Sequence, residues 1–172
     1  MIHSHSIRII LMILLLLVSG TLFAQQFEWA KGSSGNIYSN AIVTDGQGNS
    51  YVTGWYEYTA TFNTTQISSI SGTHDIFLAK YDNTGSLLWV RSAGGTASES
   101  AASVAIDQQG YCYIVGEFSG TATFGSLSVS SSGAYDGFVA KYSPNGDIVW
   151  VKKAGGNDQD FGLGICFGYH GA

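Results

Sequence analysis

The stretch Asp75-Ile-Phe-Leu-Ala-Lys-Tyr81 decides the fold, because it returns further along the chain as Asp136-Gly-Phe-Val-Ala-Lys-Tyr142. Other blocks recur in the same order at an offset of about 61 residues, and such a period indicates repeated structural units. The recurring pairs are Asp45–Gly54 with Asp107–Gly116, Thr59–Phe62 with Thr121–Phe124, Asn83–Val90 with Pro144–Val151, and Gly94-Gly95 with Gly155-Gly156. The chain is therefore built from copies of one unit.

The repeated blocks have the composition of β-strands. Short β-branched or aromatic runs alternate with turn residues, and no stretch after residue 24 has the apolar period of a helix. The strands expected in the second copy are Ala101–Ile106, Tyr111–Val115, Phe138–Tyr142 and Ile148–Lys152. Four strands per repeat, with one long loop between the second and the third, predict an all-β fold of four-stranded antiparallel blades.

Three motifs carry a resemblance to a known family. Asp-x-x-Gly-x-x-Tyr-x-x-Gly, Asp-x-Phe-x-x-Lys-Tyr and Gly-x-x-x-Trp with a following Gly-Gly resemble SBBP repeats, which are bacterial β-propeller repeats often found in large exported proteins. The resemblance covers nearly all of residues 27–167. It implies a propeller of several blades and defines no catalytic residues. Two departures are the degenerate Gly32-Ser-Ser-Gly35 and Gly168, which stands where the pattern expects the turn Asp.

The number of repeats predicts an incomplete β-propeller. Propellers close with about four to eight blades, whereas this chain holds only about 2.4 repeats. Phe27–Lys31 matches the fourth strand of an earlier blade, and Gly162–Phe167 matches the first strand of a later one. We consider three explanations, of which the first is favoured: a fragment of a longer protein, an oligomer that closes a ring of blades, or a short two-blade protein.

The repeat boundaries divide the chain into five expected segments. They are 1–24, a signal peptide; 25–39, an orphan outer strand and linker; 40–96, propeller blade 1; 97–157, propeller blade 2; and 158–172, the truncated start of blade 3.

The first 24 residues have the layout of a secretory signal peptide. Arg8 precedes the apolar run Ile9–Val18, and Ala24 supplies a small residue at the expected cleavage site. The alternative is a retained membrane anchor, for which the apolar run is short, because a membrane span needs about 20 residues. We therefore expect a secreted or cell-surface protein with no membrane span in the mature chain.

Composition excludes some functions. The 172 residues carry a formal net charge of −5, with seven Lys and Arg against twelve Asp and Glu. A nucleic-acid partner is not expected, because the chain offers no basic surface for phosphates. The two cysteines, Cys112 and Cys166, are too few for a disulfide framework and occupy different repeat positions, so we expect two buried or half-buried thiols.

Several repeated residues have an expected structural role. Asp45 and Asp107 could supply oxygen ligands to calcium, but the second copy lacks the extra oxygens, which favours a turn capped by the carboxylate. The repeated Asp and Lys residues around the third strand are expected to fix a loop or bridge strands. The repeated tryptophans could stack on sugars, but their recurrence favours packing between blades. These residues are Asp75, Lys80, Asp136, Lys141, Trp29, Trp89 and Trp150.

Residues that break the repeat are the better candidates for ligand contacts. Trp55, Tyr56 and Tyr58 stand where the second copy has Glu117, Phe118 and Gly120. They lie at the exit of the second strand, next to long loops of the kind that often carry contacts. The candidate contact residues are Trp55, Tyr56, Tyr58, Glu117 and Phe118.

No signature of a catalytic, cofactor or metal site is present in the sequence. The pattern favours a non-catalytic exported scaffold or binding module whose partner is an unknown protein or a glycan, or further blades from a longer chain or an oligomer. The alternative is part of a propeller hydrolase or lyase acting on extracellular polysaccharide. An enzyme of that kind needs converging carboxylates, for which Glu57, Glu99 and Glu117 are the candidates.

Export of the full chain from a bacterial cell should yield a product that begins at Gln25, because Ala24 ends the expected signal peptide. Mass spectrometry of the N-terminal peptide of the exported protein checks this. A product that keeps Met1 and stays with the membrane fraction would instead support the anchor.

Overall fold

The computed structural model describes residues 32–167, so the expected signal peptide and the expected strand at Phe27–Lys31 lie outside the described residues. Every regular element within this range is a β-strand. The strands are β1 (Ser33–Thr44), β2 (Ser50–Phe62), β3 (Thr65–Ser68), β4 (Asp75–Tyr81), β5 (Leu87–Gly94), β6 (Glu99–Ile106), β7 (Cys112–Phe118), β8 (Thr121–Phe124), β9 (Leu127–Ser130), β10 (Asp136–Tyr142) and β11 (Ile148–Ala154).

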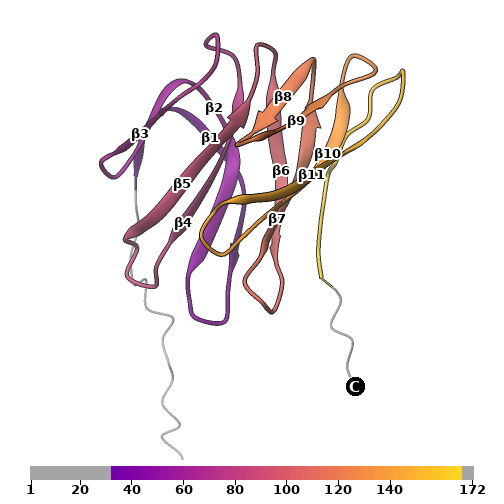
Figure 1. The fold of residues 1–172 in the computed structure, drawn as a ribbon. Coiled ribbons are helices and arrows are strands. Elements are labelled where there is room, and N and C mark those ends of the chain that lie inside the picture. The colour runs from indigo at the N-terminus through magenta and orange to yellow at the C-terminus, as the bar shows by residue number, and fades with distance from the viewer. Residues whose placement is uncertain (1–31, 168–172) are drawn as a thin grey trace, which may run out of the picture.

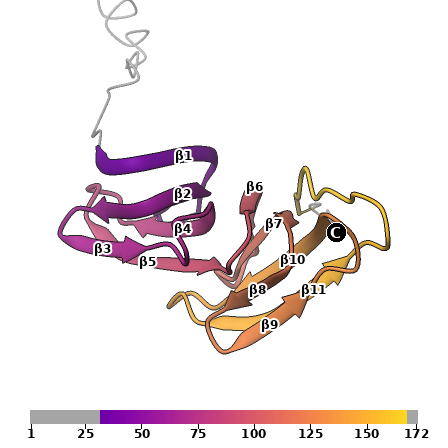
Figure 2. The ribbon, with the colours of Figure 1, turned by 90° about the horizontal axis from the view of Figure 1, so that it is seen from above.

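These strands form two antiparallel four-stranded units, each built by one repeat. Blade 1 has the order β1-β2-β4-β5, and blade 2 has the order β6-β7-β10-β11 (Figure 1). Seen from above, the two sheets lie next to each other (Figure 2). The expected all-β fold of antiparallel blades is therefore confirmed.

The four strands expected in blade 2 all form, with ends that differ by a few residues from the expected ones. The first strand of blade 1 is longer than expected and begins at Ser33, because Ser33 and Ser34 pair with Phe62 and Thr61 on β2. A boundary at residue 40 thus falls inside β1. The strand expected at Gly162–Phe167 is absent, because no neighbouring strand pairs with it in the described part of the chain.

The long loop of each repeat contains a hairpin. In blade 1 the end of β2 pairs with β3, and in blade 2 the strands β8 and β9 pair with each other. The hairpin of blade 2 reaches across to blade 1, where Phe124 pairs with Ala93 and Thr123 pairs with Gly94. Backbone pairing therefore links the two repeats.

Side chains of β5 strengthen this link. The indole Nε1 of Trp89 donates to the carbonyl of Pro144 at 3.2 Å, in the turn between β10 and β11. Arg91 donates from Nε to the Gly146 carbonyl at 2.8 Å and from Nη2 to the Asn145 carbonyl at 2.9 Å. The prediction that the repeated tryptophans pack between blades is confirmed for Trp89, whereas Trp29 lies outside the described residues.

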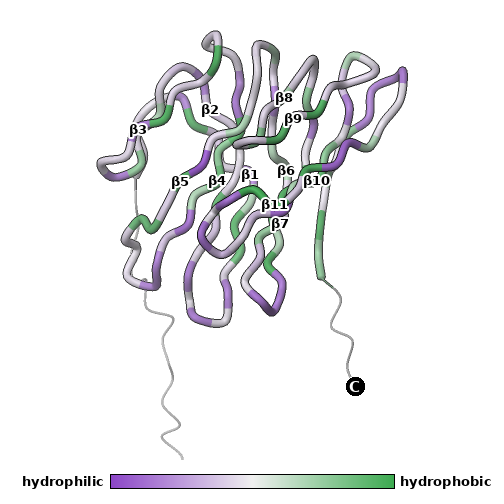
Figure 3. Tube along the Cα trace, viewed as in Figure 1, coloured by the Kyte–Doolittle hydropathy of each residue, from purple (hydrophilic) through white to green (hydrophobic). Residues whose placement is uncertain are grey.

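The main core lies between the sheets. Side chains of blade 1 such as Leu78 meet side chains of blade 2 such as Ile114 and Phe138. A second cluster, which includes Tyr56 and Phe77, covers the other face of blade 1, because successive residues of a strand point to opposite faces. Figure 3 shows hydrophobic residues along the strands and hydrophilic residues in the turns at the lower end.

The repeated aspartates after the first strand cap tight turns. Asp45 Oδ1 accepts hydrogen bonds from the backbone N–H groups of Gln47 and Asn49, both at 2.9 Å. Asp107 Oδ1 likewise accepts hydrogen bonds from the backbone N–H groups of Gln109, at 3.0 Å, and Tyr111, at 2.8 Å. The turn interpretation is confirmed, and these bonds explain why the Asp is repeated.

Replacing Asp45 by Ala should lower the free energy of unfolding by about 1–3 kcal/mol, because two turn N–H groups lose their acceptor. Urea denaturation checks this. The matched control is Asp158→Ala, an exposed carboxylate with no side-chain hydrogen bond among the described residues, which should change stability by less than about 0.5 kcal/mol. Equal losses in the two variants would contradict the capping role.

Candidate binding surfaces

Two of the residues expected to contact a ligand belong to the core instead. Tyr56, in the middle of β2, and Phe118, at the end of β7, occupy equivalent places opposite Asp75 and Asp136. Both side chains are fully buried. The Tyr56 hydroxyl is 2.6 Å from Ser92 Oγ on β5. Neither side chain is accessible to a ligand in this structure.

The other three candidates do not form a single site. Tyr58 is 65% exposed, has a φ of 55°, and lies where β2 bends into its hairpin. Glu117 is half-buried on β7, and burial raises the pKa of its carboxyl. Its side chain points to the face opposite to that of Phe118, which packs toward blade 1. Only Trp55 has an extended group of aromatic neighbours near the surface.

Trp55 is the middle member of a three-ring stack. Its ring centroid is 4.0 Å from that of Tyr38 on β1, with an interplanar angle of 16°. His74, which directly precedes β4, supplies the third ring. Its centroid is 4.0 Å from that of Trp55, with an interplanar angle of 27°. The Tyr38 side chain is 56% exposed, so the stack has an open end.

A carboxylate lies beside this stack. Glu57 Oε1 is 2.7 Å from Nε2 of His74, and Glu57 Oε2 accepts from Asn36 Nδ2 at 3.2 Å. We call Asn36, Tyr38, Trp55, Glu57 and His74 the aromatic site. Ring face, carboxylate and amide together offer stacking and hydrogen bonding at one place on the surface.

The aromatic site breaks the repeat. Ser100 and Glu117 pair across β6 and β7 at the place where Tyr38 and Trp55 pair in blade 1, and Tyr135 replaces His74. Sequence reasoning found Trp55 but missed Tyr38 and His74. The departure from the repeat was a usable signal for both, but only the strand register shows that the three rings meet.

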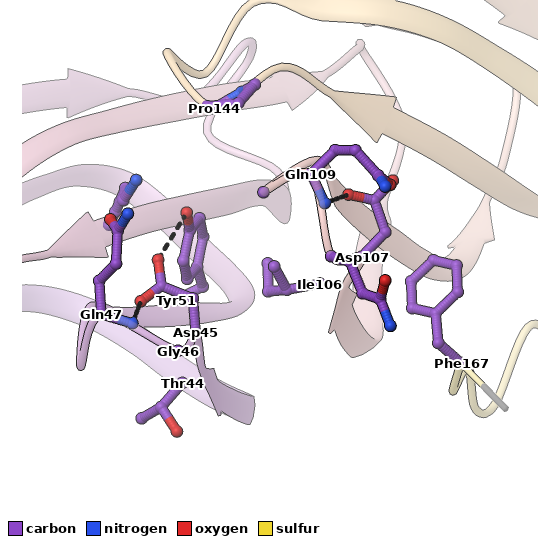
Figure 4. A pocket seen from close by; sticks show the side chains of 13 residues that line it. Thr44, Asp45, Gly46, Gln47, Tyr51, Ile106, Asp107, Gln109, Pro144 and Phe167 are labelled. Carbon is purple, nitrogen blue, oxygen red and sulfur yellow. Dashed lines mark hydrogen bonds between the residues drawn. The ribbon is translucent and has the colours of Figure 1, made fainter. Parts of the chain in front are cut away.

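A groove lies between the turn ends of the two blades. It has a volume of about 890 Å³, and its walls include the Asp45 and Asp107 turns, with Tyr51 and Ile106 between them (Figure 4). The Lys80 ammonium also lines it, almost buried and 4.9 Å from the centre of the Tyr51 ring. Most of these residues recur in both repeats, so the groove follows from the way the turns are built.

The repeated acids at the start of the third strands hold loops. Asp75 Oδ2 accepts from the Ile70 N–H at 3.1 Å, and Asp136 Oδ2 accepts from the Ser132 N–H at 2.8 Å. Asp136 also pairs with Lys153 at 3.1 Å. The expected loop-fixing role is confirmed for both. Burial raises the pKa of the Asp75 carboxyl to about 6.

Glu117 does not converge with Glu57, another of the three carboxylates considered for catalysis. Glu57 shares the face of Trp55, which points toward blade 2, whereas Glu117 points from blade 2 away from blade 1. Glu99 is buried at the start of β6, where its Oε2 accepts from the Gly95 N–H at 3.0 Å. Burial raises the pKa of the Glu99 carboxyl to about 8.

Cys112 is buried and Cys166 is exposed, and both thiols are free. The expectation of a buried or half-buried thiol is confirmed for Cys112 and wrong for Cys166, which lies in the segment after β11 where no strand covers it. Within residues 32–167 no cluster of three or more His, Cys, Asp or Glu side chains has the arrangement of a metal site. The same range contains no helix that is long and apolar enough to cross a membrane.

Stability should fall as pH rises from 5 to 8, because Glu99 loses its proton in the unfolded chain but keeps it in the folded chain over most of this range. Its pKa is about 8 in the folded chain and about 4.3 in the unfolded chain, so the unfolded state releases the proton first. In Glu99→Gln this fall should shrink by more than about 1 kcal/mol, as measured by urea denaturation at both pH values. The surface control Asp158→Asn should keep the full fall, and an unchanged fall in Glu99→Gln would contradict the assignment.

Parts of this chain are similar in sequence to known proteins. The family model for SBBP, a beta-propeller repeat, matches residues 22–55. The chain is 35% identical over 146 residues to the regulatory protein FlaEY of Caulobacter vibrioides, covering 81% of this chain and 14% of that protein. It is 30% identical over 134 residues to an uncharacterized WD repeat-containing protein, L264, of Acanthamoeba polyphaga mimivirus, covering 67% of this chain and 9% of that protein.

The chain thus spans a small part of each of these two relatives. The family match agrees with the motifs that recur through the sequence and with the two antiparallel blades. Residues 22–55 thus match a β-propeller repeat of the SBBP type.

Proposed function

We propose that this chain is a non-catalytic, exported β-propeller repeat protein that acts as a scaffold or binding module at or outside the cell surface. The repeat family and the relatives named as regulatory and WD repeat-containing support a repeat-based binding or regulatory module. The signal-like first 24 residues support export. In such a module repeated residues hold the blades, and residues that differ between blades make contacts.

The aromatic site carries this proposal. Its Tyr38–Trp55–His74 stack exists in blade 1 alone of the two described blades, and the core does not need it, since Ser100 and Glu117 stand in the equivalent places of blade 2. The outer end of the stack is open at Tyr38. A residue set that is not needed for the fold and remains exposed is a candidate for recognition.

A glycan is the ligand that this chemistry fits best. The face of Tyr38 can pack on the C–H face of a sugar ring, and the Glu57 carboxylate and Asn36 amide can bond to its hydroxyl groups. Because Glu57 already contacts His74 and Asn36, its position is fixed before a ligand arrives. Fixed contact groups reduce the entropy that binding costs.

The alternative, a polysaccharide hydrolase or lyase, has less support. Glycoside hydrolysis commonly needs two carboxylates within about 10 Å across one substrate. Here Glu57 and Glu117 point to different faces of different blades, and Glu99 is buried. Glu57 and Glu117 therefore do not face one substrate, and the buried Glu99 carboxylate is not accessible to one in this structure.

Replacing Tyr38 by Ala should weaken glycan binding at least about tenfold, because the open ring of the stack is lost. The measurement is binding of the labelled, exported protein to an array of bacterial oligosaccharides, followed by titration of the best ligand. Tyr58→Ala is the matched control, since Tyr58 is also exposed, at 65% against 56% for Tyr38, but lies outside the stack. Equal binding by both variants, or binding of no saccharide at all, would overturn the proposed ligand.

A further inference from the structure

Two buried carboxylates lie together at the junction of the blades. Asp75, at the start of β4, and Glu99, at the start of β6, are each only 1% exposed. The Glu99 N–H donates to the carbonyl of His74, the residue before Asp75, at 2.8 Å. Burial raises the pKa of the Glu99 carboxyl, and the charge of Asp75 adds to this rise, so the two carboxylates are close enough to interact. We call them the Asp75–Glu99 pair.

Each carboxylate of this pair has one oxygen without a partner. Asp75 Oδ2 accepts from the Ile70 N–H, and Glu99 Oε2 accepts from the Gly95 N–H. Asp75 Oδ1 and Glu99 Oε1 are also buried, but they accept no hydrogen bond from the described residues. A buried oxygen of this kind is costly to leave without a partner, and a bound ion is one physical explanation for it.

The carboxylates fit against the backbone because the two residues beside them are glycines. A Cβ on Gly94 would stand 2.8 Å from Asp75 Oδ1, which is too close for a real side chain. A Cβ on Gly95 would stand 3.6 Å from Glu99 Oε1 and would overlap the carbonyl oxygen of Thr121, the first residue of β8. Both carboxylates therefore lie against one short stretch of backbone, with the Thr121 carbonyl beside it.

Blade 2 has the same pair of acids and adds a cation to it. Asp136 and Asp160 stand in the equivalent places and make the same kinds of hydrogen bond to backbone N–H groups. A Cβ on Gly155 would be 2.7 Å from an oxygen of each, so these two carboxylates also lie close together. Asp136 Oδ1 has no partner, but the Lys153 ammonium lies 3.1 Å from Asp136 Oδ2. Blade 2 thus balances charge on its acids with a side chain of its own.

Blade 1 has a neutral side chain in the place of this lysine. Ser92 occupies the position of Lys153, and its Oγ lies 2.6 Å from the Tyr56 hydroxyl. No Lys, Arg or His within residues 32–167 forms an ion pair with Asp75 or Glu99. The Asp75–Glu99 pair therefore combines two carboxylates with no counter-charge from the described part of the chain.

We propose that the Asp75–Glu99 pair binds a divalent cation, for which Ca²⁺ is the fitting ion. Asp75 Oδ1 and Glu99 Oε1 supply two charged ligands, and the Thr121 carbonyl is the candidate third. Because carboxylates bind metals in their charged form, the ion displaces the proton that Glu99 holds without it. Bound there, the ion ties β4 of blade 1 to β6 and β8, which follow it in the chain.

The ligand chemistry selects the ion. All the ligands are oxygens, which favours hard cations over zinc, a metal that is usually bound by His and Cys. Calcium accepts carboxylates, backbone carbonyls and water in irregular geometry, whereas Mg²⁺ demands a nearly ideal octahedron. Two carboxylates at one place also match the charge of a divalent ion.

Calorimetric titration of the EDTA-treated full chain with CaCl₂ at pH 8 tests this proposal. We expect one bound ion per chain and a higher urea midpoint in about 10 mM CaCl₂ than in EDTA, since this exceeds the dissociation constants of about 0.1–1 mM typical of extracellular calcium sites. Glu99→Gln keeps the shape of the side chain but removes its charge, so it should weaken binding at least about tenfold. The matched control Asp158→Asn alters an exposed carboxylate and should bind Ca²⁺ as the unchanged chain does.

A second variant copies the arrangement of blade 2. Tyr56→Phe combined with Ser92→Lys places in blade 1 the side chains that Phe118 and Lys153 supply in blade 2. The new ammonium should take the place of the ion, so this variant should fold and lose its response to Ca²⁺. Circular dichroism checks that the variant is folded, and blade 2 already accommodates the same combination of side chains.

Three results would overturn the proposal. The first is no Ca²⁺ binding by the folded, EDTA-treated chain. The second is equal binding by the Glu99→Gln and Asp158→Asn variants, which would place the ion elsewhere on the chain. The third is an equal response to MgCl₂, which would indicate loosely held ions instead of a calcium site.

Discussion

The structure depends on how the outer strand of one blade meets the turn of the next. The Trp89 indole and the Arg91 guanidinium bind three backbone carbonyls in one turn, and Ala93–Gly94 pairs with the hairpin of blade 2. These polar contacts lie at the border of the apolar core shared by the two sheets. Each blade alone has an exposed apolar face, so the junction is what converts two small sheets into one folded body.

This constraint separates the residues into two groups. Repeated residues form the turns, fix the loops and make the junction, as the paired roles of Asp45 and Asp107 and of Asp75 and Asp136 show. Residues that differ between the blades do not have these structural roles. The aromatic stack beside Glu57 belongs to this second group, and for that reason it is the place where recognition can vary without loss of the blade.

Much of the fold could be predicted from the sequence because the repeat is nearly regular. Matching blocks predicted all four strands of blade 2, with ends that differ by a few residues, and the repeated Asp that precedes a Gly predicted the turn. The candidate site was less predictable. Tyr56 and Phe118 looked distinctive but point into the core, since alternation along a strand is decided by register and bulges that the sequence does not display. Tyr38 and His74 meet Trp55 only because β1 and β4 pair with β2 on either side, and the sequence alone does not show this register.

The most direct test of this account is a solution NMR measurement of cross-strand contacts between β5 and β8. If the outer strand of blade 1 pairs with the hairpin of blade 2, nuclear Overhauser effects should connect backbone protons of Gly94 with those of Thr123 and of Ala93 with those of Phe124. Intense contacts of this antiparallel kind are the predicted result. Their absence, with the contacts inside each blade intact, would contradict the claim that the junction of blades holds the structure together.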